Sequence, residues 1–481
     1  MQKRNLLIII LFLFTGTIGW SAERIRQNFD FDWQFRLGEQ GIYKPVQLPH
    51  DWSIELDFNE EVGPESGYLP GGIGYYKKDF NVPASYKGKR VSIVFDGIYH
   101  KATIYLNGQE VDYHRYGYTS FETDLTPYLK YGGKNTLSVK VDHSEKSRWY
   151  TGSGIYRHVW MQVTNPIHVK MWGTYITTPR VSAESAIVSC VTTVANTSAL
   201  TGEIEIMQRI VDAQGNLLKI NGKQYAARTE VVMPENGTKD IAQSFTLSNP
   251  QLWNLEKPYL YRLETILKQK GKVIDRYTTR FGVRTIGFDK DKGFFLNGKN
   301  IKMKGACLHQ DAGCLGVAVP NRSYERRLTI LKEFGANAIR CSHNPPSPEF
   351  LNYCDSIGFL VVDEAFDKWK SGYYEQFFDE CWQQDIRDMI VRDRNHPSIV
   401  LWSIGNELAE ATRKDNVGVE RATLLRDFVH KLEPTRPTML ALAPAYQDKF
   451  ASVTDVVGYN YSELSYIEDK KKHPERIGLI S

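Results

Sequence analysis

The sequence predicts a multidomain chain in which a jelly-roll β-sandwich and an immunoglobulin-like β-sandwich precede an incomplete (β/α)8 TIM barrel. Three observations support this prediction. The chain has 481 residues, more than one hydrophobic core accommodates. Strand-like segments without convincing amphipathic helices fill the first part, and strands alternating with helices follow Gly293. We therefore expect domains at residues 23–165, 166–288 and 289–481.

Residues 1–22 have the features of a secretory signal peptide. The basic pair Lys3-Arg4 precedes an apolar run at residues 6–14, and small residues lead to Ala22. The apolar run is too short for an ordinary membrane span, although an uncleaved anchor is the alternative. We therefore expect a bacterial protein that is periplasmic or secreted, with no membrane span after the signal peptide is cleaved.

Short, alternating or β-branched segments separated by turns predict two β-sandwiches. Residues 91–95, 102–106 and 136–141 are such strands, with a turn at Asn107-Gly108, and they predict the jelly-roll domain. Residues 186–194, 202–207 and 259–266 predict strands of the second domain. Their spacing is typical of an immunoglobulin-like sandwich, although no Cys-Trp-Cys signature is present.

The last region predicts seven of the eight strands of a barrel. The strands are expected at residues 301–308, 336–342, 359–364, 399–406, 438–443, 455–461 and 476–481, with helices between them such as 323–334, 348–357, 382–393 and 417–432. A TIM barrel has eight strands. Because the seventh strand ends at the last residue, Ser481, we expect the chain to be a truncated piece of a longer enzyme.

Polar or ionisable residues follow the apolar body of most of these barrel strands. Barrel enzymes place their chemistry at the carboxyl ends of the strands. The residues at these ends are His309, Gln310, Asp311, Arg340, His343, Asn344, Asp363, Glu364, Asn406, Glu407, Asn460 and Tyr461. Any one of them could be a structural residue, but as a set they predict a polar pocket that suits a sugar.

Glu407 is the strongest catalytic candidate in this set. It follows the apolar segment 400–405 and Asn406, which should bury it partly. Burial raises the pKa of a carboxyl group, so that the group can act as a general acid near neutral pH.

Other classes of site and partner are less well supported. His309 and His343 could bind a metal beside Asp311 and Glu364, but no fixed ligand spacing supports this, so we predict neither a metal nor a cofactor. No Gly-x-Ser-x-Gly elbow is present. The formal charge of +4 includes no basic stripe, which disfavours nucleic acid as a partner. The six cysteines have no zinc-like spacing and are expected to be mostly free thiols.

Several motifs resemble those of glycoside hydrolase family 2, the family of β-galactosidases, β-glucuronidases and β-mannosidases. They are Leu-Pro-His-Asp-Trp at 48–52, Gly-Ser-Gly-Ile-Tyr-Arg at 152–157, Phe-Gly-Val-Arg-Thr-Ile at 281–286, Asn-Gly-Lys at 297–299, Arg-Cys-Ser-His-Asn-Pro at 340–345, Val-Asp-Glu-Ala-Phe-Asp at 362–367 and Gly-Asn-Glu at 405–407. The resemblance extends from about Phe29 to the end of the chain, and it implies the same three-domain architecture.

The resemblance also implies roles for individual residues. Glu407 would be the acid/base, and the nucleophile would be a glutamate directly after Ser481, so no nucleophile can be named here. The implied substrate-binding residues are His309, Arg340, His343, Asn406 and Tyr461, to which we add Asp311, Asn344 and Asp363. Arg148, Trp149 and Tyr150 either reach the pocket from the first domain or pack at the domain interface. Some relatives hold magnesium with a Glu-x-His pair after strand three, but residues 366–370 read Phe-Asp-Lys-Trp-Lys here.

The implied reaction is hydrolysis of a terminal β-linked sugar with retention of configuration. The resemblance favours a β-galactosidase, with a β-glucuronidase or β-mannosidase as the alternative, acting on an oligosaccharide or glycoconjugate. A non-catalytic carbohydrate-binding protein is the alternative from another class, because the expected nucleophile is absent from this chain. The sequence leaves the oligomeric state open.

Overall fold

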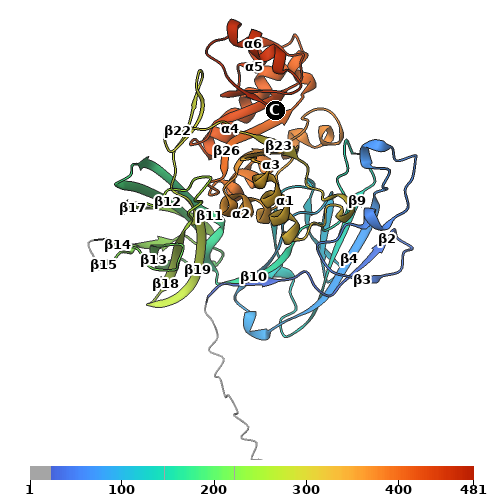
Figure 1. Ribbon diagram of the computed structural model, residues 1–481. Helices are drawn as coiled ribbons and strands as arrows, with labels where there is room; N and C mark the ends of the chain where they lie inside the picture. Colours follow the sequence, from blue (N-terminus) through green and yellow to red (C-terminus); the bar gives the residue numbers. More distant parts are fainter. Residues whose placement is uncertain (1–22, 146, 221–222) are drawn as a thin grey trace, which may run out of the picture.

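A computed structural model of the protein describes residues 23–145, 147–220 and 223–481. The expected signal peptide, residues 1–22, lies outside the described residues. In Figure 1 the first sandwich lies at the right in blue, the second at the left in green, and the barrel strands lie above them in orange and red. The predicted fold class, two β-sandwiches and an incomplete barrel, is confirmed.

The first domain consists of two antiparallel sheets, with strand orders β1-β10-β5-β8 and β3-β2-β4-β9-β6-β7. Its strands are β1 (Ile25–Asn28), β2 (Trp33–Leu37), β3 (Lys44–Val46), β4 (Gly72–Val82), β5 (Arg90–Phe95), β6 (Ala102–Leu106), β7 (Gln109–His114), β8 (Phe121–Asp124), β9 (Gly133–His143) and β10 (Val159–Thr164). Leu137, Val139 and Val141 alternate along β9 and are at most 1% exposed. This period of two buries one face of the sheet and fixes the register of the strand.

The second domain packs a three-stranded sheet, β11-β12-β17, with a four-stranded sheet, β16-β13-β18-β19. The strands are β11 (Ile167–Val181), β12 (Ser185–Asn196), β13 (Gly202–Val211), β16 (Ala227–Met233), β17 (Gly237–Ser248), β18 (Tyr261–Gln269) and β19 (Lys272–Phe281), with a short pair β14 (Lys219–Ile220) and β15 (Lys223–Gln224). A small sheet of β20 (Ile286–Asp289), β21 (Gly293–Leu296) and β22 (Lys299–Asn300) leads into the barrel.

The barrel region has seven parallel strands in sequence order, β23 to β29. Its elements are β23 (Gly305–Leu308), α1 (Asn321–Glu333), β24 (Ala338–Cys341), α2 (Pro348–Ile357), β25 (Leu360–Glu364), α3 (Phe378–Asp393), β26 (Ile399–Asn406), α4 (Val417–Leu432), β27 (Thr438–Leu442), α5 (Asp448–Ala451), β28 (Val456–Tyr459), α6 (Glu463–Lys472) and β29 (Ile477–Ile480). The sheet curls so far that Ser481 Oγ, after β29, lies 3.9 Å from Cys307 Sγ of β23.

Two predicted element starts differ by four residues from those of the structure. The first barrel strand begins at Gly305 rather than at residue 301, because the backbone N–H of Ile301 donates to the carbonyl of Phe294 in the preceding small sheet. Helix α3 begins at Phe378 rather than at residue 382, and Asp379 and Glu380 occupy its first turn. Acidic residues at this position favour a helix start because their negative charge interacts favourably with the positive end of the helix dipole.

Buried arginines join the sandwiches to the barrel. The Arg157 guanidinium is 3% exposed and donates to the carbonyls of Tyr118 in the first domain and Pro345 in the barrel, each at 2.8 Å. Arg284 donates to the carbonyls of Pro397 and Ile399 from the far side of the barrel. The contacts of Arg157 fasten the first domain to the loop after β24, at the carboxyl ends of the barrel strands.

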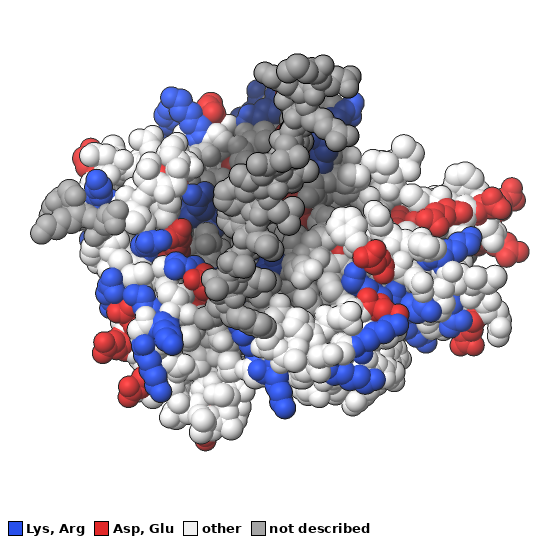
Figure 2. Space-filling view, turned by 90° about the horizontal axis from the view of Figure 1, so that it is seen from below, with Lys and Arg blue, Asp and Glu red and all other residues white. Residues whose placement is uncertain are grey.

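The distribution of charged side chains on the surface agrees with the absence of a basic stripe from the sequence. Basic and acidic side chains are interspersed on the face shown in Figure 2. No helix in the described part of the chain is both long enough and apolar enough to cross a bilayer.

Candidate active site

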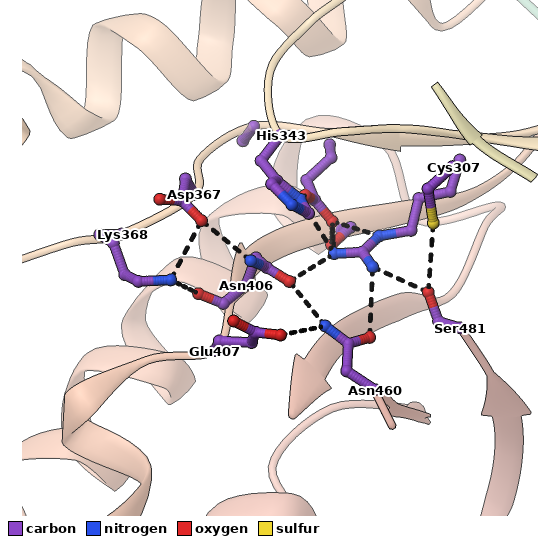
Figure 3. A network of polar contacts seen from close by, with 12 residues as sticks. Cys307, His343, Asp367, Lys368, Asn406, Glu407, Asn460 and Ser481 are labelled. Atoms are coloured by element: carbon purple, nitrogen blue, oxygen red, sulfur yellow. Dashed lines mark hydrogen bonds and ion pairs between the residues drawn. The ribbon is translucent and has the colours of Figure 1, made fainter. Parts of the chain in front are cut away.

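Arg340 is the centre of a polar cluster at the carboxyl ends of the barrel strands (Figure 3). Its side chain is 5% exposed, and it donates from Nε to Glu364 Oε2 at 2.8 Å and from Nη2 to Asn406 Oδ1 at 2.8 Å. Nη1 donates to Asn460 Oδ1 at 3.3 Å and to Ser481 Oγ at 2.8 Å. A buried guanidinium is stable only when its N–H groups are paired in this way.

Glu364 provides the negative charge that compensates Arg340. Burial would raise the pKa of its carboxyl group, but the charge of Arg340 and the hydrogen bonds from His343 and Ser403 outweigh this effect and lower the pKa. His343 Nδ1 lies 2.6 Å from Glu364 Oε1. Glu364 therefore remains ionised at neutral pH and holds Arg340 and His343 in place.

Asn406 and Asn460 connect Arg340 to Glu407. Asn460 donates from Nδ2 to Asn406 Oδ1 at 2.9 Å and to Glu407 Oε1 at 3.1 Å. Asn406 donates from its own Nδ2 to Asp367 Oδ1 at 2.9 Å. The amide orientations are thereby fixed, and Glu407 is placed at the end of a continuous hydrogen-bond chain.

Glu407 is held at the point where β26 ends. Its backbone has a φ of 47°, in the left-handed region, and its N–H donates to the carbonyl of Ala441 at 2.7 Å. A non-glycine residue rarely adopts this conformation, and such strain clusters at functional sites. The side chain keeps 18% of its exposure, as a proton-transfer group open to a substrate requires.

Arg148 and Lys368 place two cations beside Asp367. Arg148, from the first domain, lies with Nε 2.9 Å from Asp367 Oδ2 and with Nη2 3.8 Å from Glu407 Oε2. Lys368 Nζ donates to Asp367 Oδ1 at 3.0 Å and to the carbonyl of Asn406 at 2.8 Å, and burial lowers the pKa of its ammonium group although Asp367 acts to raise it. A magnesium ion does not fit these donors, because an ammonium group already binds this carboxylate and this carbonyl.

Two histidines and a tryptophan form one wall of the site. The Trp149 ring lies 5.2 Å from that of His309 and 5.8 Å from that of His343, measured between centroids. Burial and the nearby His343 lower the pKa of His309. His309 is therefore neutral at neutral pH and can exchange hydrogen bonds with a sugar hydroxyl. Trp149 thus reaches the site from the first domain, whereas the Tyr150 hydroxyl donates to Asp51 at 2.5 Å within that domain.

Four predicted substrate-binding residues lie outside the Arg340–Glu407 cluster. Asp363 is fully buried on the opposite face of β25, where burial and the nearby Asp393 raise the pKa of its carboxyl group. Asn344 is 2% exposed and donates to the carbonyl of Pro345 at 3.0 Å. Asp311 accepts from the N–H of Gly313 at 3.2 Å in the loop after β23. Tyr461 is 81% exposed.

Two residues of the cluster, Asp367 and Lys368, were not among the predicted strand-end residues, and Glu364 and Asn460 were among them but had no predicted catalytic or substrate-binding role. Glu364 is adjacent to Asp363, and successive residues of a strand point to opposite faces, so only one of the two can face the site. The sequence identified this pair but not the face. Asp367 and Lys368 follow β25 in a loop, whose conformation no periodicity specifies.

A second acidic group lies outside this site. Ligand atoms of Asp448, Asp469 and His473 lie within 4.8 Å of one another. The Arg476 guanidinium lies 2.7 Å from Asp469 and 3.5 Å from Asp448, so this group is an ion-pair network.

Three family models match the chain in order. The sugar-binding domain of glycosyl hydrolases family 2 matches residues 31–166, the central model of glycosyl hydrolases family 2 matches residues 167–284, and the family 2 TIM barrel domain matches residues 289–477.

Individual relatives agree with these matches. A β-galactosidase of Bacteroides ovatus is 41% identical over 96% of this chain and 59% of its own length, and a β-glucuronidase of Bacteroides fragilis is 30% identical over 98% of this chain and 70% of its own length. A solved structure of a glycosyl hydrolase family 2 member from Bacteroides cellulosilyticus matches with a TM-score of 0.90 and 39% identity, covering 95% of this chain and 61% of that one. The chain thus spans about three fifths of the length of the Bacteroides ovatus relative, and it belongs to glycosyl hydrolases family 2.

Proposed function

We propose that the complete protein is a retaining, exo-acting β-glycosidase whose substrates are terminal β-galactosides. The position of Glu407 carries this proposal: it lies at the carboxyl end of β26, held by Asn460 and faced by Arg148. Its carboxyl group is the one in this cluster that is neither fully buried nor bonded to Arg340 or Lys368 among the described residues.

In this reaction Glu407 acts first as an acid and then as a base. A second carboxylate about 5 Å away attacks the anomeric carbon while Glu407 transfers its proton to the departing glycosidic oxygen. Glu407 then removes a proton from water, whose oxygen displaces the enzyme carboxylate and releases the sugar. We assign no nucleophile among the described residues, because Glu364 and Asp367 are already paired with cations.

The choice of a galactoside rests on one observation: the Bacteroides ovatus β-galactosidase is similar to this chain at 41% identity. A β-glucuronidase is the second candidate, because the Bacteroides fragilis β-glucuronidase is also similar over nearly the whole chain.

A panel of nitrophenyl β-D-glycosides tests the proposal. The galactoside, glucuronide, mannoside and glucoside are supplied to the product of the complete gene, and the anomer formed first is followed by NMR. Turnover of the galactoside with the β-anomer appearing first is the expected result. Turnover of the glucuronide alone would show that the substrates are β-glucuronides rather than β-galactosides. No turnover of any of the four glycosides would overturn the proposal.

We also propose that the protein is exported from a bacterial cell, on the basis of residues 1–22. Fractionation of cells that express the tagged protein should recover it from the periplasm or the medium. Recovery from the cytoplasm alone would contradict the proposal.

A further inference from the structure

A cavity adjoins the Arg340–Glu407 cluster. It has a volume of about 250 Å³ and lies between the first domain and the barrel. The first domain contributes Tyr99, Tyr116, Tyr118 and Trp149 to its walls, and the barrel contributes Phe366 and Tyr374. Among the rings of this aromatic pocket, Trp149 also borders His309 and His343 of the candidate site, and the hydrolytic reaction described above uses none of the others.

The walls of the aromatic pocket are rings packed against one another. Tyr116 lies at the centre, with ring centroids 5.1 Å from Tyr374, 5.3 Å from Tyr118 and 5.6 Å from Phe366. Phe366 and Tyr374 stack with centroids 4.8 Å apart and planes 28° apart. This packing fixes the rings, so the cavity is preformed and a ligand would not have to order it.

The hydroxyl groups of two wall tyrosines are already engaged within the protein. Tyr116 donates to the carbonyl of Ala365, and Tyr374 donates to the buried carboxyl group of Asp385. The ring carbon atoms of these two tyrosines therefore face the cavity, and their hydroxyl groups do not need a ligand as a partner. A bare sugar, whose hydroxyls need partners, suits such walls poorly, whereas an aromatic or other apolar group suits them well.

Polar residues of the aromatic pocket connect it to the catalytic cluster. Arg148, His343, Asp367 and Lys368 belong to both. Arg148 lies 3.8 Å from Glu407 Oε2, the side of the acid that faces the first domain. In a glycosidase the leaving group lies beside the acid that protonates its oxygen, so a leaving group that extends from Glu407 toward the first domain would enter this pocket.

We infer that the aromatic pocket binds the aglycone, and that the substrates of this protein are β-glycosides of phenols or of similar flat, apolar alcohols. This inference rests on the proposed glycosidase function. Size supports it, since an apolar cavity of about 150 Å³ is enough to bind benzene, and this cavity is larger. One substituted aromatic ring fits, with its glycosidic oxygen directed toward Glu407.

Non-hydrolysable ligands test the inference without interference from leaving-group reactivity. The phenyl and methyl 1-thio-β-D-glycosides of the sugar that the nitrophenyl panel identifies are titrated calorimetrically into the complete protein. Ser371 lines the pocket and has no part in the catalytic cluster. Ser371→Trp should fill the cavity, and Ser371→Ala is the matched control.

The wild type and Ser371→Ala should bind the phenyl ligand about tenfold or more tightly than the methyl ligand, because a ring is buried. Ser371→Trp should remove this preference and leave the affinity for the methyl ligand within about threefold of the wild type. Equal binding of the two ligands by the wild type, a preference that survives in Ser371→Trp, or loss of both ligands from that variant would each overturn the inference. Failure of the wild type to bind either ligand would overturn the proposed glycosidase function as well.

Discussion

Glu407 combines a strained backbone with a partly open carboxyl group. The left-handed conformation costs on the order of 1 kcal/mol, and the hydrogen bond from its N–H to Ala441 helps to hold it. Asn460 binds one carboxyl oxygen, and the other lies 3.8 Å from Arg148 Nη2, on the side that faces the first domain. The residue is thus oriented before a substrate arrives, and its replacement should affect chemistry more than binding.

Glu407→Gln should lower kcat by about 10²–10⁴-fold for substrates with poor leaving groups, because these need the proton. The loss for dinitrophenyl glycosides, which leave without protonation, should be far smaller. Steady-state kinetics on both substrate types measure the difference, and Glu420→Gln on the exposed face of α4 is the control. Equal losses for both types would exclude the acid role.

Asp385 is a buried carboxyl group whose ionisation opposes folding. It is 4% exposed, and burial raises its pKa to about 8 although the hydrogen bond from Tyr374 acts to lower it. A raised pKa in the folded state means that the unfolded chain ionises first. Asp385 therefore lowers the stability of the fold progressively as the pH rises from about 4 to about 8.

Asp385→Asn should remove this pH dependence. The variant should gain on the order of 2 kcal/mol over the wild type at pH 8.5 and little at pH 5. Thermal melts across this pH range measure the effect, with Asp427→Asn at an exposed position as the control. A variant less stable than the wild type at pH 8.5 would contradict the assignment.

At the scale of elements, the loop after β24 is fastened to the first domain through Arg157. Its guanidinium supplies donors to carbonyls on both sides of the interface. Removing it leaves buried acceptors without partners, which is costly.

Arg157→Met should therefore lower the free energy of unfolding by about 3 kcal/mol. Urea unfolding measures this, with Arg322→Met as the control, because the Arg322 side chain is 79% exposed. A loss no larger than that of the control would show that the interface does not depend on Arg157.

The order of elements and the strand ends could be predicted from the sequence, because periodicity and turn residues are local signals. The face of the sheet on which each of these side chains lies could not be predicted from the sequence. Asp363 and Glu364 are chemically similar neighbours, and the register of β25 decides which one meets Arg340. Lys368 was missed and Asn460 was given no role for a related reason, since their roles arise only from contacts between different strands and loops.

At the scale of the whole molecule, the candidate site belongs to two domains. Arg148 and Trp149 come from the first domain and contact Asp367, Glu407 and the two site histidines. The sequence predicted that this segment either reaches the pocket or packs at the interface, and the structure shows that Trp149 and Arg148 reach the barrel residues.

Arg148→Gln should lower kcat/KM by about tenfold or more without changing the melting temperature. The Arg148 side chain is 51% exposed, so its ion pair contributes less than about 1 kcal/mol to stability. Kinetics and thermal melts of this variant and of Lys134→Gln, which is also in an exposed ion pair, separate the two effects. Unchanged kinetics would place Arg148 outside the catalytic site.

The position of Arg340 also bears on how the barrel assembles. Its partners are delivered by β25 and β26 and by the residues that follow β28 and β29. A two-residue slip in β25 keeps the apolar pattern intact, but it removes Glu364, the carboxylate that compensates the buried guanidinium, at a cost of about 3–5 kcal/mol. The pairing of one buried side chain therefore disfavours a shifted strand register in the curled sheet, and it does so in the absence of substrate.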